Sequence, residues 1–338
     1  MKSLKSNPNI EGSQIDRRTF LKVSTVLGGT IVLGASPCLF AQTTKRISVA
    51  TGGMGGVYFP LGGAIAASVT KYVPGVEAAA EVTAASVDNC KLVGAKKADL
   101  GIVMGDTAYD AYAGLNMFKQ KLPIRNIAVL YSNVMHVVAP QSKGIKSVAD
   151  LKGKTISTGA PGSGVEVMAL RILDANGINP DKDVKRDRLG ASESAGALKD
   201  GKIEAFFWCG GVPTASVLDL AASPGMKLDF IPNKDSIDKM TSKHGPVYFP
   251  KSIPKTAYSG MVADVPVAAV GNLLIANEAM EDKLVEGILA AMFDHKAELV
   301  AVHKQAEDLD LKDAVVGSPI PFHKAAIAFY KSRGLKVE

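Results

Sequence analysis

Two glycine-rich segments are the parts of this chain best suited to binding a small molecule. Residues 51–58 read TGGMGGVY, and residues 159–164 read GAPGSG. Each follows a strand-like run and precedes a helix-like run, so main-chain N–H groups without a nearby Cβ would lie beside the positive end of a helix. This arrangement suits an anion such as a carboxylate. A tight turn without a ligand is the alternative, and the GxGxxG spacing of dinucleotide loops is absent from the first segment.

Other polar or aromatic residues stand where predicted strands end. Ser86 and Asp106 open predicted helices and would be N-caps by default. If they face a cleft, Asp88 or Asp106 could accept a hydrogen bond from an ammonium or hydroxyl group of a ligand. Trp208 is the only tryptophan and lies just before a Gly-Gly turn. It either packs in the core or lines the cleft.

Patterns for catalysis or metal binding are missing from the sequence. The five histidines have no metal-ligand spacing, no GxSxG motif is present, and no pair of acids calls for acid–base chemistry. We therefore expect no catalytic residues, no metal and no cofactor. His136 lies in a strand-like run, which favours a structural role.

Strand and helix patterns alternate from residue 46 onward. The predicted strands are 46–51, 76–83, 99–104, 127–131, 135–139, 154–157, 205–208 and 267–276, and the predicted helices are 57–71, 87–95, 106–113, 163–175, 195–199 and 214–221. This alternation predicts an α/β fold of parallel sheets with helices on both faces, and ligands bind such folds at the carboxyl ends of the strands. Residues 231–266 contain five prolines and are predicted to be a looser connection.

The length of 338 residues suits two lobes, and the 47% of hydrophobic residues can form a core in each. We predict that residues 46–138 and 262–338 form lobe I and that residues 139–261 form lobe II. Cys90 and Cys209 are predicted to occupy small buried positions. Whether they come close enough to form a disulfide is left open.

Residues 1–41 resemble a twin-arginine signal peptide. Arg17 and Arg18 precede a short apolar stretch at residues 23–33, and Ala41 is the expected cleavage position. An uncleaved anchor is the alternative. This leader holds five basic and two acidic residues, so it supplies +3 of the formal net charge of +6, and the remainder gives no reason to expect nucleic-acid binding. No other segment is long and apolar enough to span a bilayer, so we expect a mature periplasmic protein that does not cross the membrane.

Taken together, these segments resemble the TAXI family, the receptors of one class of tripartite ATP-independent periplasmic (TRAP) transporters. The matching segments are residues 51–63, 81–89, 98–102, 145–154, 159–164 and 198–207, in family order. The resemblance implies a type II periplasmic-binding-protein fold with two lobes and a ligand cleft between them. It also implies membrane subunits driven by an ion gradient, and a small carboxylate or amino-acid ligand such as glutamate or glutamine.

The resemblance assigns ligand contacts residue by residue. They are Gly53, Gly56, Val57, Tyr58, Ser86, Val87, Asp106, Gly162, Ser163, Gly211, Val212, Pro213 and Thr214, and Trp208 is added because of its own position. The chain departs from the family pattern at residues 104–106, which read MGD, and at residues 131–133, which read YSN where an acidic residue often follows Tyr-Pro. We expect a monomer that closes about a hinge. An enzyme that uses the same cleft, or a receptor for another transporter or a sensor, is the alternative.

Overall fold

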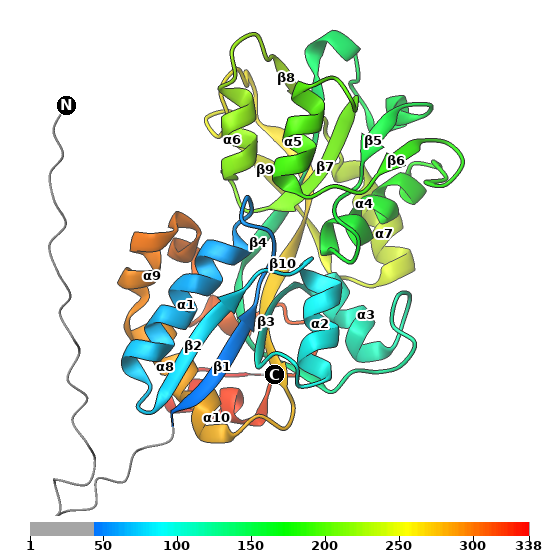
Figure 1. Ribbon diagram of the computed structural model, residues 1–338. Coiled ribbons are helices and arrows are strands. Elements are labelled where there is room, and N and C mark those ends of the chain that lie inside the picture. Colours follow the sequence, from blue (N-terminus) through cyan, green and yellow to red (C-terminus); the bar gives the residue numbers. More distant parts are fainter. Residues whose placement is uncertain (1–43, 338) are drawn as a thin grey trace, which may run out of the picture. The chain divides into compact units, whose positions relative to one another are not determined.

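Two long antiparallel strands organise the computed structural model, which describes residues 44–337. β4 (Ile124–Pro140) and β10 (Val265–Asn277) pair along most of their length and run through both lobes (Figure 1). They lie in one mixed sheet with the strand order β2-β1-β3-β10-β4-β7-β5-β6, while β8 pairs with β4 and β9 pairs with β10. The predicted leader, residues 1–41, lies outside the described residues, so the twin-arginine assignment stays a prediction.

The first lobe is built on the outer strands next to β10. Its strands are β1 (Lys45–Ala50), β2 (Val76–Glu81) and β3 (Leu100–Met104), and its helices are α1 (Tyr58–Tyr72), α2 (Ser86–Gly94), α3 (Gly105–Ala113), α8 (Asp282–Asp294), α9 (Lys296–Val302) and α10 (Lys324–Ser332). One apolar cluster joins α1, α8 and α10 to one face of the sheet, and another joins α2 and α3 to the opposite face. Helices therefore cover both faces, as predicted.

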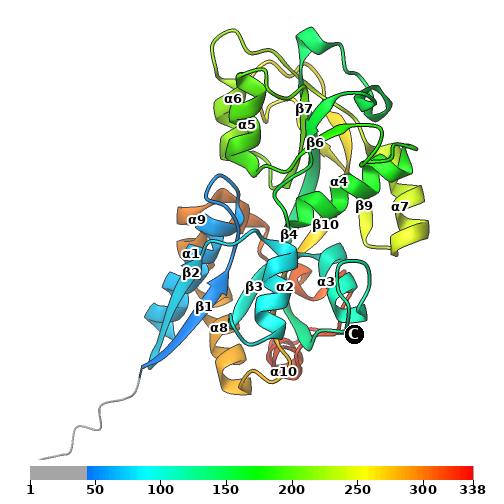
Figure 2. The same ribbon diagram turned by 45° about the vertical axis from the view of Figure 1, so that its right-hand side comes forward.

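The second lobe repeats this arrangement on the other side of β4 (Figures 1 and 2). Its strands are β5 (Thr155–Ser157), β6 (Lys185–Asp187), β7 (Ala205–Gly210), β8 (Leu228–Phe230) and β9 (Tyr248–Ile253), and its helices are α4 (Gly164–Ala175), α5 (Ala191–Lys199), α6 (Ala215–Ala221) and α7 (Ile237–His244). Short 3-10 helices are η2 (Gln141–Lys143), η3 (Val148–Leu151), η4 (Lys234–Ser236), η5 (Lys304–Asp308) and η6 (Asp313–Val315). Helices α4 and α7 pack on one face of the sheet, and α5 and α6 on the other.

Three predictions about the elements need correction. Residues 127–131 and 135–139 are parts of the single strand β4. Residues 231–266 are not a loose connection, because they contain α7 and β9, and β9 uses Pro250 within a strand that pairs only with β10. A proline is tolerated there because it is on an edge strand. The sheet is parallel only within each lobe, since β4 and β10 both pair antiparallel to their neighbours.

The strand register shows where the chain passes from one lobe to the other. β4 pairs with β7 from Val134 onward, and β10 changes from β9 to β3 between Val270 and Asn272. Both points lie at the centre of the sheet and within predicted lobe I, before its boundary at residue 138 and after its boundary at residue 262. The predicted boundaries at residues 138 and 262, which concern the parts that move together, stay a prediction. None of the helices in residues 44–337 is both long and apolar enough to cross a bilayer.

Adjacent glycines in α1 provide a test of how closely this helix packs. Leu61, Ile65 and Val69 bury one stripe of the helix. A Cβ on Gly62 would lie 2.4 Å from Thr51 Cγ2, at the end of β1, whereas a Cβ on Gly63 would meet nothing within 4 Å. Gly62 is therefore what allows α1 to approach the end of β1.

We predict opposite effects for the two alanine variants. Gly62→Ala should lower the free energy of unfolding by about 1–3 kcal/mol through overpacking. Gly63→Ala should raise it by about 0.5–1 kcal/mol, because alanine restricts the unfolded chain and fits the helix. Urea unfolding of both variants measures the difference. Equal stability would contradict the close approach of α1 to β1.

Candidate functional site

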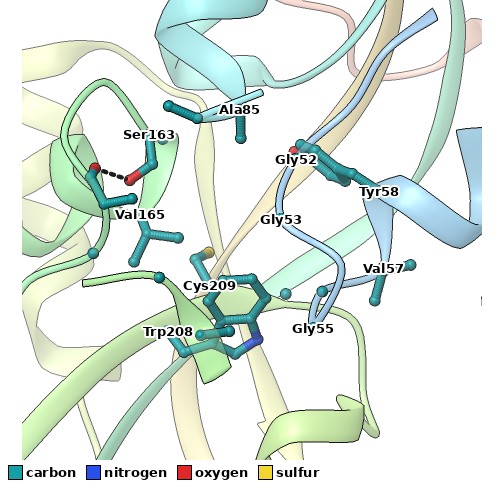
Figure 3. A pocket seen from close by; sticks show the side chains of 18 of the residues that line it. Gly52, Gly53, Gly55, Val57, Tyr58, Ala85, Ser163, Val165, Trp208 and Cys209 are labelled. Atoms are coloured by element: carbon teal, nitrogen blue, oxygen red, sulfur yellow. Dashed lines mark hydrogen bonds between the residues drawn. The ribbon is translucent and has the colours of Figure 1, made fainter. Parts of the chain in front are cut away.

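A cavity of about 350 Å³ lies among the loops at the carboxyl ends of the strands of both lobes (Figure 3). From the first lobe it is lined by residues 52–58 and 83–86 and by Met104, Tyr131 and Asn133. From the second lobe it is lined by residues 159–160, 163–165, 189–193 and 208–210. The position agrees with the prediction that strand ends would form the site.

The first glycine-rich loop forms one wall of the cavity and leads into α1. Gly56 N–H donates to Gly53 C=O at 3.2 Å, which closes a turn just before the helix. The 15-residue helix α1 has no side-chain N-cap and no acidic residue in its first turn. Its positive end is therefore available to a ligand, and of the predicted contacts Gly53, Gly56, Val57 and Tyr58 line the cavity.

Asn89 holds the loops of the first lobe in place. Its amide Nδ2 donates to the carbonyls of Thr51 at 2.6 Å and Ile102 at 2.8 Å, and its Oδ1 accepts from Thr83 Oγ1 at 2.6 Å. These partners come from the ends of β1 and β3 and from the loop after β2. One fully buried side chain thus satisfies main-chain groups that the strands leave unpaired and sets the shape of the wall.

Ser86 and Tyr58 contribute hydroxyl groups near the cavity floor. Ser86 Oγ accepts from the N–H of Met104 at 3.1 Å, so the hydroxyl also joins α2 to the end of β3. Tyr58 OH donates to Asn272 Oδ1, and Asn272 Nδ2 donates to the carbonyl of Tyr131 at 3.3 Å. Burial raises the pKa of Tyr58 and that of Tyr131 well above the usual value. Both phenols are therefore neutral.

The second glycine-rich loop differs from the prediction of open amides. Gly162 N–H donates to Glu166 Oε2 at 3.2 Å, and Ser163 Oγ accepts from Glu166 N–H at 3.1 Å. The Glu166 carboxylate also accepts two hydrogen bonds from Arg188, at 2.5 and 2.9 Å. The chain's own carboxylate therefore occupies the start of α4. Ser163 lines the cavity, but Gly162 does not.

Gly162 instead connects the two lobes. Its carbonyl accepts from the N–H groups of Val87 at 3.1 Å and Asp88 at 3.4 Å, at the start of α2. A Cβ on Gly162, which has φ +79°, would lie 2.9 Å from Asp88 Oδ1. Val87, another predicted contact, is accordingly not among the residues that line the cavity. The amides at this helix start are already bonded to protein.

Trp208 lines the cavity and is held from behind by the loop that follows it. Its indole Nε1 donates to Thr214 Oγ1 at 2.9 Å, and Thr214 Oγ1 donates to the carbonyl of Gly211 at 2.7 Å. None of the predicted contacts at residues 211–214, namely Gly211, Val212, Pro213 and Thr214, lines the cavity. The Thr214 hydroxyl, held by the carbonyl of Gly211, fixes the indole instead.

Asp106 also lies outside the residues that line the cavity. It is fully buried, and its carboxylate accepts from Tyr248 OH at 2.9 Å, from Arg171 at 3.3 Å and from the N–H of Thr107 at 2.7 Å. Arg171 also pairs with Asp110. Burial raises the pKa of Asp106, and the guanidinium of Arg171 opposes that rise. Asp106 thus joins α3 to α4 and β9 of the second lobe.

Several lining residues were not predicted. Tyr131 and Asn133 come from β4, and residues 189–193 come from the loop and first turn of α5, which a hydrogen bond of 2.8 Å between Ser157 and Ser194 holds in place. The polar residues Ser132 and Asn133 interrupt the apolar residues 127–130 and 134–135 of β4, which was a signal available in the sequence. The loop at 189–193 carries no comparable signal.

The chemistry of the cavity favours hydrogen bonding and apolar contact. Glu193 is the only acid among its lining residues, and none of them is Lys, Arg or His. Cys209 lines the cavity, and Cys90 lies in the core of the first lobe. Both are free thiols, and both are buried, as predicted. Burial raises the pKa of each thiol, which makes neither a ready nucleophile. In residues 44–337 no group of three or more acids, histidines and cysteines is placed to hold a metal.

The fold and the position of the cavity define the class. The chain has a type II periplasmic-binding-protein fold, with a mixed α/β sheet and a cavity between two lobes. The family model described as the NMT1-like family matches residues 49–334. The chain therefore belongs to the NMT1-like family.

Two solved structures illustrate the similarity in fold. A binding-protein component of an ABC phosphonate transporter from Pseudomonas aeruginosa is 12% identical with a TM-score of 0.51, and the match covers 78% of this chain and 79% of that one. A protein from Bordetella bronchiseptica RB50 is 20% identical with a TM-score of 0.50, and the match covers 86% of this chain and 82% of that one. At these identities the likeness concerns the fold alone.

His136 belongs to the hydrogen-bonded groups that support Trp208, and its Nδ1 lies 3.3 Å from the carbonyl of that residue. Its Nδ1 lies 3.0 Å from the carbonyl of Val134, and its Nε2 lies 2.9 Å from Tyr258 OH, which accepts from the N–H of Thr214 at 3.0 Å. The imidazole is fully buried, and burial lowers its pKa from 6.5 to about 4. This agrees with the predicted structural role, because the neutral ring suits these contacts.

We predict that His136 destabilises the protein as the pH falls. Since the pKa is lower in the folded state, the unfolded chain binds more protons between pH 6.5 and 4, so the stabilisation is complete above pH 6.5 and is lost below it. Between pH 7 and pH 5 the loss should be about 2 kcal/mol. Urea unfolding of the parent and of His136→Gln across this range isolates the effect as their difference. Parallel curves would show that His136 does not titrate in this way.

Proposed function

We propose that the protein is an extracytoplasmic solute-binding receptor for a small carboxylate or an amino acid such as glutamate or glutamine. The observation that carries this proposal is the cavity of about 350 Å³ walled by loops of both lobes. Such a volume suits a small metabolite, and a mostly apolar lining with a few placed polar groups is typical of ligand sites. The experiment that tests it is mass spectrometry of the solute released when the exported protein is denatured.

The carboxylate would bind at the uncapped start of α1. Gly53, Gly56 and Tyr58 lie there, and Ser86 lies across the floor of the cavity. The helix end and the hydroxyl of Ser86 would stabilise one negative charge without a cationic side chain. Ser163 and Trp208 would complete the site from the second lobe. Because no nucleophile–base pair lines the cavity, we propose binding without turnover.

Binding would act by closing the lobes about β4 and β10. The two lobes approach each other closely at two glycines of the first loop. An added Cβ would lie 2.1 Å from Ser192 Oγ at Gly55 and 2.9 Å from Trp208 Cη2 at Gly56. A solute that contacts both walls favours the arrangement with these contacts. In this proposal the moving parts are residues 46–138 with 262–338 and residues 139–261.

We propose that the partner is a TRAP transporter of the TAXI type, that the receptor is a periplasmic monomer, and that a twin-arginine signal exports it. The resemblance of the glycine-rich segments supports this choice. An ABC transporter is the competing partner, since a neighbour in fold is a component of an ABC phosphonate transporter. Solute uptake with the membrane subunits in vesicles decides between them. Uptake that requires an ion gradient supports a TRAP partner, and uptake that requires ATP contradicts it.

We predict that Gly56→Ala weakens solute binding. The added Cβ would lie 2.9 Å and 3.1 Å from two carbons of Trp208, and the indole is held by Thr214. Overpacking of about 1–3 kcal/mol in the closed arrangement corresponds to a loss of affinity of about tenfold to a hundredfold. Calorimetry with the released solute measures the affinity, and Trp208 fluorescence reports the displaced indole.

Gly63→Ala is the matched control for this prediction. It introduces the same methyl group seven residues further along the chain, in open space. It should bind the solute with the parent's affinity. If Gly56→Ala also binds as tightly as the parent, the loop does not meet Trp208 in the bound state, and the proposed closure is wrong.

A further inference from the structure

Two side chains on the cavity floor have polar atoms without a partner. Asn133 is 1% exposed and Tyr131 is 5% exposed, and both line the cavity. Asn133 Oδ1 and Tyr131 OH are buried, and neither makes a hydrogen bond to any described residue. Buried polar groups in native proteins are nearly always bonded, so an unpaired pair at a cavity wall indicates a group that a ligand supplies.

The local strand structure explains why both side chains reach the cavity. The register of β4 against β10 shifts between the pairs Leu273–Val129 and Gly271–Ser132, which marks a bulge. Bulges bend a strand and re-aim its side chains. Asn272 stabilises this one, since its side chain bonds the carbonyl of Tyr131 and accepts from Tyr58 OH. Tyr131 lies within the bulge and Asn133 directly after it, and both line the cavity.

The unpaired atoms define the kind of group that fits them. A carbonyl oxygen such as Asn133 Oδ1 requires a donor, which an ionised carboxylate lacks. The neutral phenol of Tyr131 can both donate and accept. A matching ligand group therefore carries a donor and an acceptor on neighbouring atoms.

The charges around the cavity exclude a second negative group. None of the residues that line it is cationic. The Arg188 guanidinium is bound to Glu166, and that of Arg171 to Asp106 and Asp110. A second carboxylate at Tyr131 and Asn133 would be buried without a counter-charge, which is unfavourable.

We infer that the solute carries one carboxylate and, at its other end, an uncharged primary carboxamide held by Tyr131 and Asn133. This inference rests on the proposed function and specifies its ligand class. The requirement for a carboxamide distinguishes amide solutes from diacids of the same shape, which the size of the cavity alone cannot distinguish.

Matched pairs of probes test this inference. Glutamine and glutamate differ in one terminal group, as do succinamate and succinate. The amide of at least one pair should bind the parent protein at least tenfold more tightly than its acid. In Asn133→Leu that preference should fall to less than threefold, because the acceptor for the N–H of the ligand carboxamide is gone. Tyr131→Phe should reduce the preference in the same direction. Calorimetry measures all of these affinities.

Stability distinguishes a binding role from a structural one. Because the Asn133 oxygen has no partner in the protein, Asn133→Leu should keep the melting temperature of the ligand-free parent or raise it. Gln120→Leu, at an exposed position, is the control and should bind every probe as the parent does. A melting temperature of Asn133→Leu several degrees below the parent's would mean that the amide serves the fold, and would overturn the inference.

The remaining outcomes separate the inference from the proposed function. Acids that bind as tightly as their amides, or a released solute with two negative groups or no carboxamide, overturn the inference and leave the receptor function intact. A released solute that carries a carboxylate and a carboxamide supports it even if the four probes bind weakly. If no solute is released and no probe binds, the proposed function fails and the inference fails with it.

Discussion

The antiparallel pairing of β4 with β10 is the constraint on which the rest of this structure depends. These two strands belong to both lobes, so every other strand finds its place by pairing with them directly or through one or two neighbours. Their ladder also contains the bulge at residues 129–133 and 271–273. The floor of the cavity, with Tyr131, Asn133 and Asn272 nearby, is therefore built into the element that joins the lobes. Any motion between the lobes must bend this ladder beside the polar floor.

Several helices begin near the cavity; α5 carries the acid Glu193 in its first turn, and the positive ends of α1, α2 and α4 have different partners. The start of α2 donates to the carbonyl of Gly162, and the start of α4 is bonded to Glu166. Only α1 begins without a side-chain cap or an acid in its first turn. Glycines after a strand are thus insufficient to identify an anion site, because what matters is whether the protein itself already satisfies the amides. In this cavity one helix end of the three remains for a ligand.

The sequence predicted the alternating elements well because apolar spacing and glycine stops are local signals. Helices 57–71, 163–175 and 214–221 were each placed within one residue of α1, α4 and α6. What could not be predicted depended on contacts distant in the chain. Asp106 looked like a cleft acid until its partner Arg171, 65 residues away, was seen to hold it in the core. Likewise, Thr214 looked like a ligand contact, but its hydroxyl serves Trp208. Residue type at a strand end predicts where a site lies, and tertiary hydrogen bonds decide which side chains remain free to serve it.

Tertiary contacts also decide which charged side chains remain free to face the cavity. Two arginines are each neutralised by carboxylates of the protein, Arg171 by Asp106 and Asp110 and Arg188 by Glu166. The Arg171 pairs are buried and join α3 to α4, while the exposed Arg188 binds the buried Glu166 at the start of α4. The cavity is left with neutral hydroxyls, amides and one helix end. Such groups discriminate by hydrogen-bond direction, because an unmatched donor or acceptor loses water without replacing it. In the proposed receptor, recognition therefore depends on the pattern of donors and acceptors that the solute presents, and a negative charge would be stabilised only at the end of α1.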